Sequence, residues 1–166
     1  MRENSSAADP DPADREIRQR ELWRDILLDH FRDPRGRTPL AQPSCRREVR
    51  NPLCGDRLVL ELTVAKDRVR EVSARARGCS LSVASASMLA ERLPGLTIGE
   101  VRDLSRTVQA YLTASADPAG GIDLGEIEAL GGVRRLAARR PCALLPWRCL
   151  DTLLGEDARV SNEPLR

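Results

Sequence analysis

Residues 57–77, RLVLELTVAKDRVREVSARAR, predict two antiparallel strands joined by a tight turn. Leu58, Leu60 and Leu62 occupy every second position and therefore share one face, as expected of a half-buried strand. Residues 69–77 alternate in the same way, and Lys66-Asp67 is placed to form the turn. A shorter alternating run over residues 46–50 predicts a third antiparallel strand next to these two.

Helical patterns lie on both sides of these strands. A helix is predicted from Glu21 to Phe31, where apolar residues return at helical spacing until the Asp33-Pro34-Arg35-Gly36 segment stops it. After the strands, the small residues of positions 81–89 predict a closely packed helix that ends near Pro94-Gly95. Thr97 and Glu100 have the spacing of a capping box, so another helix is expected from there to Leu112.

The carboxy-terminal third is predicted to be less regular. Residues 116–121 favour a flexible break, residues 123–130 a short turn or helix, and residues 134–140 a basic connection. The last helix contains Trp147 and Leu154. Because a proline is tolerated only in the first turn, Pro146 predicts that this helix begins no earlier than about Ala143.

Length and composition favour one domain. With 166 residues, of which 41% are apolar, the chain can bury one core but not two comfortable ones. We expect a domain over residues 21–155, a disordered tail over residues 1–20 and a flexible tail over residues 156–166. The net charge of +2 and the scarcity of aromatic side chains argue against nucleic-acid binding. No stretch has the length of a membrane span, which predicts a cytoplasmic protein with no membrane partner.

Cysteines flank the central strands. Cys54-Gly55-Asp56 comes directly before residue 57, Gly78-Cys79 directly after residue 77, and Cys142 lies far downstream. Thiolates are soft anionic ligands for zinc or iron, whereas a carboxylate is a weaker ligand that exchanges more easily. Three thiolates and one carboxylate on a divalent cation leave a net charge of about −2, which needs nearby positive groups, and Arg139 and Arg140 stand just before Cys142. A helix beginning after Cys79 would favour its thiolate.

Together these motifs resemble the U-type iron-sulfur assembly family, which comprises IscU, the amino-terminal domain of NifU and, most similar here, SufU. The resemblance covers roughly residues 22–154 and rests on the following segments: Ile26-Leu27-Leu28-Asp29-His30-Phe31-Arg32-Asp33-Pro34-Arg35, Asn51-Pro52-Leu53-Cys54-Gly55-Asp56, residues 78–88, residues 123–130, and Cys142-Ala143 with Trp147. It implies an α+β fold in which a three-stranded antiparallel sheet packs against a layer of about four to five helices.

Residues 123–130 resemble the SufU branch, and Pro141 stands where IscU has a histidine. The SufU resemblance implies that Cys54, Asp56, Cys79 and Cys142 hold zinc, that a SufS-like cysteine desulfurase donates persulfide sulfur to Cys54, and that Arg139 supports the charged site. Such a protein would be at most a zinc-dependent sulfurtransferase that feeds downstream iron-sulfur assembly machinery. The IscU resemblance implies instead a scaffold that assembles iron, as a [2Fe-2S] cluster, on the same ligands and hands it on.

Structural interpretations compete with these functions. Cys45 and Cys149 are expected to be buried core residues, and His30 a packed or hydrogen-bonded residue instead of a ligand. A zinc-stabilised interaction module without sulfur chemistry remains an alternative. So does a degenerate relative that binds a desulfurase without accepting sulfur. A thiol redox protein is disfavoured because the sequence contains no Cys-x-x-Cys pair.

Overall fold

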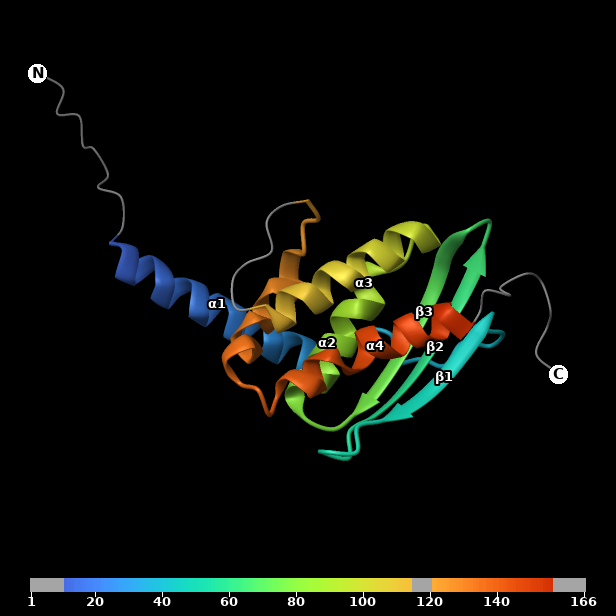
Figure 1. Ribbon diagram of the computed structural model, residues 1–166, viewed down its shortest axis with the longest axis horizontal. Helices are drawn as coiled ribbons and strands as arrows, with labels where there is room; N and C mark the ends of the chain where they lie inside the picture. The colour runs from blue at the N-terminus through green and yellow to red at the C-terminus, as the bar shows by residue number, and fades with distance from the viewer. Residues whose placement is uncertain (1–10, 115–120, 157–166) are drawn as a thin grey trace, which may run out of the picture.

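A three-stranded antiparallel sheet of order β1-β2-β3 forms the centre of the computed structural model, and helices cover it (Figure 1). The structure describes residues 11–114 and 121–156. Within them the elements follow one another as α1 (Pro12–Arg32), β1 (Cys45–Arg50), β2 (Arg57–Ala65), β3 (Arg68–Arg77), α2 (Ser80–Arg92), α3 (Ile98–Thr113), the 3-10 helix η1 (Gly125–Arg135) and α4 (Arg140–Glu156). The predicted α+β class is confirmed. Residues 1–10 and 157–166 of the expected tails, and residues 116–120 of the expected break over residues 116–121, lie outside the described residues.

The sheet buries the face that the alternating leucines predict. Leu60 lies opposite Arg47 of β1 and Ala74 of β3, and the side chains of Leu58, Leu60 and Leu62 are completely buried. Lys66 and Asp67 connect β2 to β3 with φ angles of 52° and 58°. Two consecutive residues with positive φ give the tight hairpin turn whose twist matches that of the strands.

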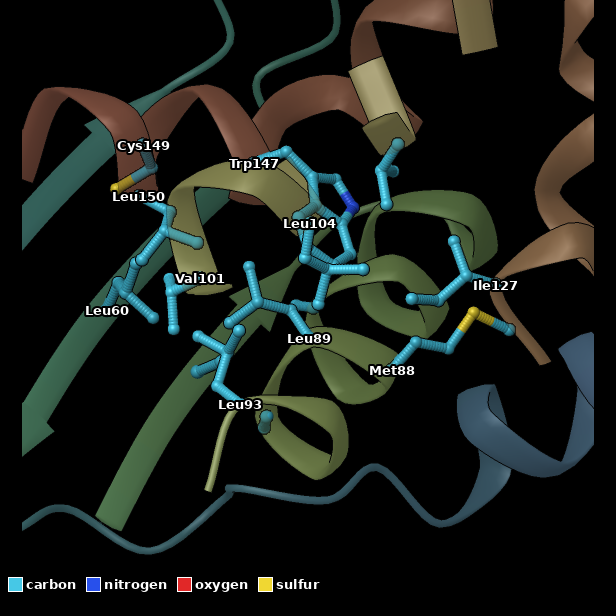
Figure 2. Packing of buried hydrophobic residues seen from close by; sticks show 14 of the residues in the cluster. Leu60, Met88, Leu89, Leu93, Val101, Leu104, Ile127, Trp147, Cys149 and Leu150 are labelled. Carbon is cyan, nitrogen blue, oxygen red and sulfur yellow. The ribbon is translucent and has the colours of Figure 1, made fainter. Parts of the chain in front are cut away.

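Helices α2, α3 and α4 cover one face of the sheet, and the core lies between them and the strands (Figures 1 and 2). Figure 2 shows Leu89 of α2, Leu104 of α3 and Trp147 of α4 in one cluster, to which Leu60 of β2 also belongs, on the side of Val101 and Leu150. Residues 82–90 of α2 are buried along their whole run, since their mostly small side chains let neighbouring helices approach closely. The capping box at the start of α3 is present as predicted.

Helix α1 begins at Pro12, so the predicted start at Glu21 is wrong, and residues 12–20 of the expected disordered tail are helical. The side chain of Asp11 caps the helix by accepting a hydrogen bond from the backbone N–H of Ala13 at 3.0 Å. Pro12 fits the first helical position, where its missing N–H costs nothing. The exposed, charged residues of this segment show no apolar periodicity, so the sequence pattern did not predict that the helix extends over them.

Helix α4 begins at Arg140, so the predicted start near Ala143 is wrong, and Pro146 lies inside the helix. An internal proline removes the hydrogen bond to the carbonyl of Cys142 and costs about 3 kcal/mol. Burial of one large apolar side chain contributes about 1.5–3 kcal/mol, and Trp147, Leu150 and Leu154 are all buried on this helix. The packing therefore outweighs the proline. The short turn or helix expected over residues 123–130 is the longer η1, which extends into the predicted basic connection.

Candidate metal centre

Three segments distant in sequence meet at one end of the sheet. Asp56 directly precedes β2 and Gly78 directly follows β3, and the pairing of Arg57 with Arg77 makes these two points neighbours. Figure 1 shows the β1–β2 loop and the β3–α2 connection at the same end of the strands. The start of α4 brings Cys142 to them.

The side chains of the predicted ligands converge there. The donor atoms of Cys54, Asp56 and Cys142 lie within 4.8 Å of one another, and the sulfur atoms of Cys54 and Cys142 are 3.6 Å apart. Cys79 lies outside this three-residue group but contacts it, because its Sγ is 3.4 Å from Oδ2 of Asp56. All four residues singled out in the sequence are therefore in one cluster, with Asp56 linking Cys79 to the others.

Asp56 is a buried carboxylate held in a fixed position. Its Oδ1 accepts a hydrogen bond from the backbone N–H of Cys79 at 3.1 Å, and its side chain presses against Gly78 so closely that a Cβ atom there would overlap the carboxylate. Burial favours a higher pKa for Asp56, but hydrogen bonds from the Cys54 thiol and from Cys79 more than offset it and hold the pKa below its usual value. Asp56 is thus an ionised carboxylate, pre-positioned as a candidate ligand.

The loop that carries Cys54 is held by Asn51, a buried residue whose role the sequence did not reveal. Its side-chain oxygen accepts a hydrogen bond from the N–H of Leu53 at 3.0 Å, and its backbone exchanges bonds with Gly55 and Asp56. Gly55 takes a φ of 75°, which a glycine adopts without strain. Asparagine followed by proline and, further on, glycine is a turn signal that could have identified this loop. The result is a rigid turn with the Cys54 side chain exposed at its tip.

Cys142 lies on the opposite, interior side of the cluster. Its side chain is buried, and its N–H donates to the carbonyl of Arg139 at 3.1 Å. Burial, together with hydrogen bonds to neighbouring thiols, raises the pKa of Cys142 far above its usual value. This thiol therefore keeps its proton at neutral pH unless a cation takes the place of that proton.

A buried polar network anchors the first turn of α4, which carries Cys142. The hydroxyl of Ser85 donates to the carbonyl of Ala143 at 2.7 Å and accepts from the indole Nε1 of Trp147 at 3.1 Å. Both side chains are fully buried. The bulky Trp147 thus fixes the position of Cys142 through its polar atom as well as through packing, which a sequence pattern does not reveal.

The remaining candidates are placed as follows. The side chain of Arg139 is exposed, and its carbonyl contacts Cys142 as described above. Cys45 and Cys149 lie in the hydrophobic core, as predicted, and burial raises the pKa of Cys149 to about 11. His30 is buried and hydrogen-bonded to Ser87 and Glu126, as its structural interpretation predicts.

The family model for the NifU-like N terminal domain matches residues 22–143, a range that contains all four clustered side chains. The chain belongs to this family. The resemblance to U-type assembly proteins is therefore confirmed. None of the helices in the described parts of this NifU-like chain is long and apolar enough to cross a membrane.

Named relatives fall into both branches of the family. The chain is 35% identical over 130 residues to the zinc-dependent sulfurtransferase SufU of Bacillus subtilis, covering 78% of this chain and 87% of the relative. It is 26% identical over 141 residues to the iron-sulfur cluster assembly scaffold protein IscU of Streptococcus pyogenes, covering 85% and 87%. The fold is similar to that of the amino-terminal NifU-like protein from Brucella abortus, with a TM-score of 0.71 and 21% identity over 79% of this chain and 90% of that one.

Proposed function

We propose that this NifU-like protein works in iron-sulfur cluster assembly in the cytoplasm by accepting persulfide sulfur from a cysteine desulfurase at a zinc site made by Cys54, Asp56, Cys79 and Cys142. The observation that carries the proposal is the exposure of the thiols. Of the five cysteines, Cys54 alone is exposed, and it belongs to the cluster. A partner's persulfide could therefore reach Cys54, while Cys142 stays buried behind it.

The donor set suits zinc. Thiolates and a carboxylate are ligands that zinc accepts in a four-coordinate arrangement, and the pre-positioned Asp56 supplies the weaker ligand of an exchangeable site. Bound zinc would keep the thiols deprotonated at neutral pH. The printed name of the Bacillus subtilis relative, a zinc-dependent sulfurtransferase, supports the same choice of metal.

The transfer step follows from the position of Cys54. Its thiolate would attack the outer sulfur of the desulfurase persulfide, so that a new S–S bond forms on Cys54 while the S–S bond of the donor breaks and the donor cysteine leaves as a thiolate. No net oxidation is needed, because the persulfide already carries sulfur at the required oxidation level. We assign Arg139 to charge support, since the ligand set with a divalent cation has a net charge of about −2.

Mass spectrometry of the chain after incubation with a SufS-like cysteine desulfurase and L-cysteine tests this proposal. We expect one additional sulfur atom on the peptide containing Cys54, and its loss in Cys54→Ala. Cys149→Ala is the matched control, because it removes a cysteine of the core and should leave the transfer intact. Sulfur transfer that is unchanged in Cys54→Ala would contradict the assignment. A chain that unfolds on zinc removal but accepts no sulfur would be a zinc-stabilised module.

The second candidate function is that of a scaffold for a [2Fe-2S] cluster. It is favoured by the same thiol cluster and by the similarity to the Streptococcus pyogenes scaffold protein. Iron and sulfide would then be cargo assembled on these ligands and passed to downstream machinery. Anaerobic incubation with iron, cysteine and desulfurase distinguishes the two, because a scaffold develops the visible absorption of a cluster whereas a zinc-dependent sulfur acceptor stays colourless.

A further inference from the structure

A second group of ligand-type side chains lies away from the cysteines, where α1, α2 and η1 meet. His30 of α1 directs its Nε2 atom toward two glutamates, at 2.7 Å from Oε2 of Glu126 in η1 and at 3.7 Å from Oε2 of Glu91 in α2. One donor atom of each residue lies within 4.8 Å of the other two. This group combines an imidazole nitrogen, which can bind a metal in its uncharged form, with two carboxylates, so it is not merely a cluster of acidic residues.

The three side chains border a cavity of about 410 Å³. The imidazole of His30 is 1% exposed, whereas the side chains of Glu91 and Glu126 are 51% and 58% exposed. The histidine therefore lies at the buried end of the group, and the two carboxylates lie at the end that is open to solvent. An ion could enter from solvent without any rearrangement of the core.

A buried hydroxyl orients the imidazole. Nδ1 of His30 lies 2.7 Å from the hydroxyl oxygen of Ser87, which also accepts a hydrogen bond from the N–H of Arg35 at 2.9 Å. If Nδ1 donates its hydrogen to Ser87, the lone pair of Nε2 is left facing the two carboxylates. A second hydrogen bond of this kind, from the nitrogen that does not bind the metal, is the usual support of a metal-ligating histidine.

We propose that His30, Glu91 and Glu126 form a second metal site, for a divalent cation that prefers nitrogen and oxygen ligands, such as Mn²⁺. Ligand atoms about 2.0–2.2 Å from an ion lie roughly 2.8–3.6 Å apart at tetrahedral or octahedral angles. The separations of His30 Nε2 from the two carboxylates, 2.7 and 3.7 Å, bracket this range, and the donor oxygens of Glu91 and Glu126 lie within 4.8 Å of each other. A divalent cation would neutralise both carboxylates.

The side chain of Arg35 does not already neutralise the two carboxylates. The guanidinium of Arg35 approaches Glu91 at 3.8 Å, but through Oε1, and its closer partner is Asp29 at 2.7 Å. Oε2 of Glu91 is the oxygen that faces His30. The proposed site therefore uses the carboxylate oxygen that Arg35 leaves available.

An ion at this site would tie η1 to α1 and α2. The segment after η1 leads through residues 136–139 to α4, which carries Cys142. The second site is thus placed to stabilise the connection to the cysteine cluster, although its existence does not rest on sulfur transfer.

Mn²⁺ distinguishes the two sites, because thiolates favour softer ions whereas carboxylates and imidazole accept manganese. The experiment titrates Mn²⁺ into untagged, zinc-loaded, full-length protein and follows free Mn²⁺ by electron paramagnetic resonance. We expect one Mn²⁺ per chain and a Kd at least tenfold weaker in Glu91→Gln and in Glu126→Gln. Glu128→Gln is the matched control, since it removes the same charge from an exposed position of η1 and should leave the Kd unchanged.

A second measurement tests the histidine without mutating a buried residue. The chain contains a single histidine, so a histidine-nitrogen coupling in the pulsed resonance spectrum of bound Mn²⁺ identifies His30. Observation of this coupling together with the losses in the two glutamine variants supports the site. Absence of binding at millimolar Mn²⁺, absence of the nitrogen coupling, or equal binding by Glu126→Gln and Glu128→Gln overturns it.

Discussion

Substitution of Gly78 by alanine tests the geometry of the candidate centre, because the backbone of this residue lies directly against the carboxylate of Asp56. A Cβ atom at residue 78 would overlap the Asp56 side chain, which is buried and cannot move into solvent. Overpacking of this kind costs about 1–3 kcal/mol. Gly78 also has a φ of 155°, which alanine rarely adopts, so strain adds about 1–2 kcal/mol.

We therefore expect Gly78→Ala to lower the free energy of unfolding by about 2–5 kcal/mol, measured by urea denaturation in the presence of a chelator. Displacement of Asp56 would also break its hydrogen bond from the N–H of Cys79. The zinc affinity, measured by competition with a chromophoric chelator, should fall at least tenfold, which corresponds to about 1.4 kcal/mol.

Gly99→Ala is the control for this experiment. Gly99 lies in α3, and the nearest atom to an added Cβ is Oγ1 of Thr97 at 3.9 Å, an ordinary contact. Because Gly99 lies in the first turn, this substitution should change the stability by less than about 0.5 kcal/mol and leave the zinc affinity unchanged. If Gly78→Ala behaves like Gly99→Ala in both assays, the close approach of Gly78 to Asp56 does not exist in solution and the argument is refuted.

Three further predictions concern the framework. Burial favours a higher pKa for Glu61, but hydrogen bonds from Arg75, from the Leu40 N–H and from Arg46 hold the pKa below its usual value. Glu61→Gln should therefore cost about 1–3 kcal/mol at neutral pH. In urea unfolding at a series of pH values, the difference from wild type should shrink as the pH falls through the lowered native pKa and the carboxylate becomes protonated. A cost that persists at low pH would contradict the ionic role. Trp147→Phe removes the hydrogen bond to Ser85 and should cost about 2–3 kcal/mol by the same assay, a neutral result arguing against the buried network. Thr97→Ala removes the cap of α3 and should lower the Tm by roughly 2–4 °C in a calorimetric scan, whereas an unchanged Tm would show that the cap is dispensable.

Much of the fold follows from local patterns. The alternation of Leu58, Leu60 and Leu62 predicted the central strand and its buried face, and the spacing of Thr97 and Glu100 predicted the start of α3. These features depend on residues close together in the chain. The starts of α1 and α4 were mispredicted because the first is an exposed, charged helix set by its cap, and the second contains a proline that tertiary packing tolerates.

The sequence likewise predicts some features of the candidate site and not others. The motifs around Cys54, Cys79 and Cys142 identified the candidate ligands. Only the antiparallel pairing of β2 with β3 and the anchoring of α4 bring these side chains together. The partners of His30 could not be predicted, since Glu126 lies far away in the sequence and no periodicity relates the two. Long-range contacts between side chains of different elements are what single-sequence patterns do not contain.

In the proposed centre, three cysteines and one aspartate from distant segments bind one metal ion. X-ray absorption at the zinc edge, on protein purified without oxygen and loaded with one zinc per chain, tests it most directly. We expect three sulfur ligands at about 2.3 Å and one oxygen ligand at about 2.0 Å, with one sulfur fewer in Cys142→Ala. A ligand shell without sulfur, or one that is unchanged in Cys142→Ala, would contradict it.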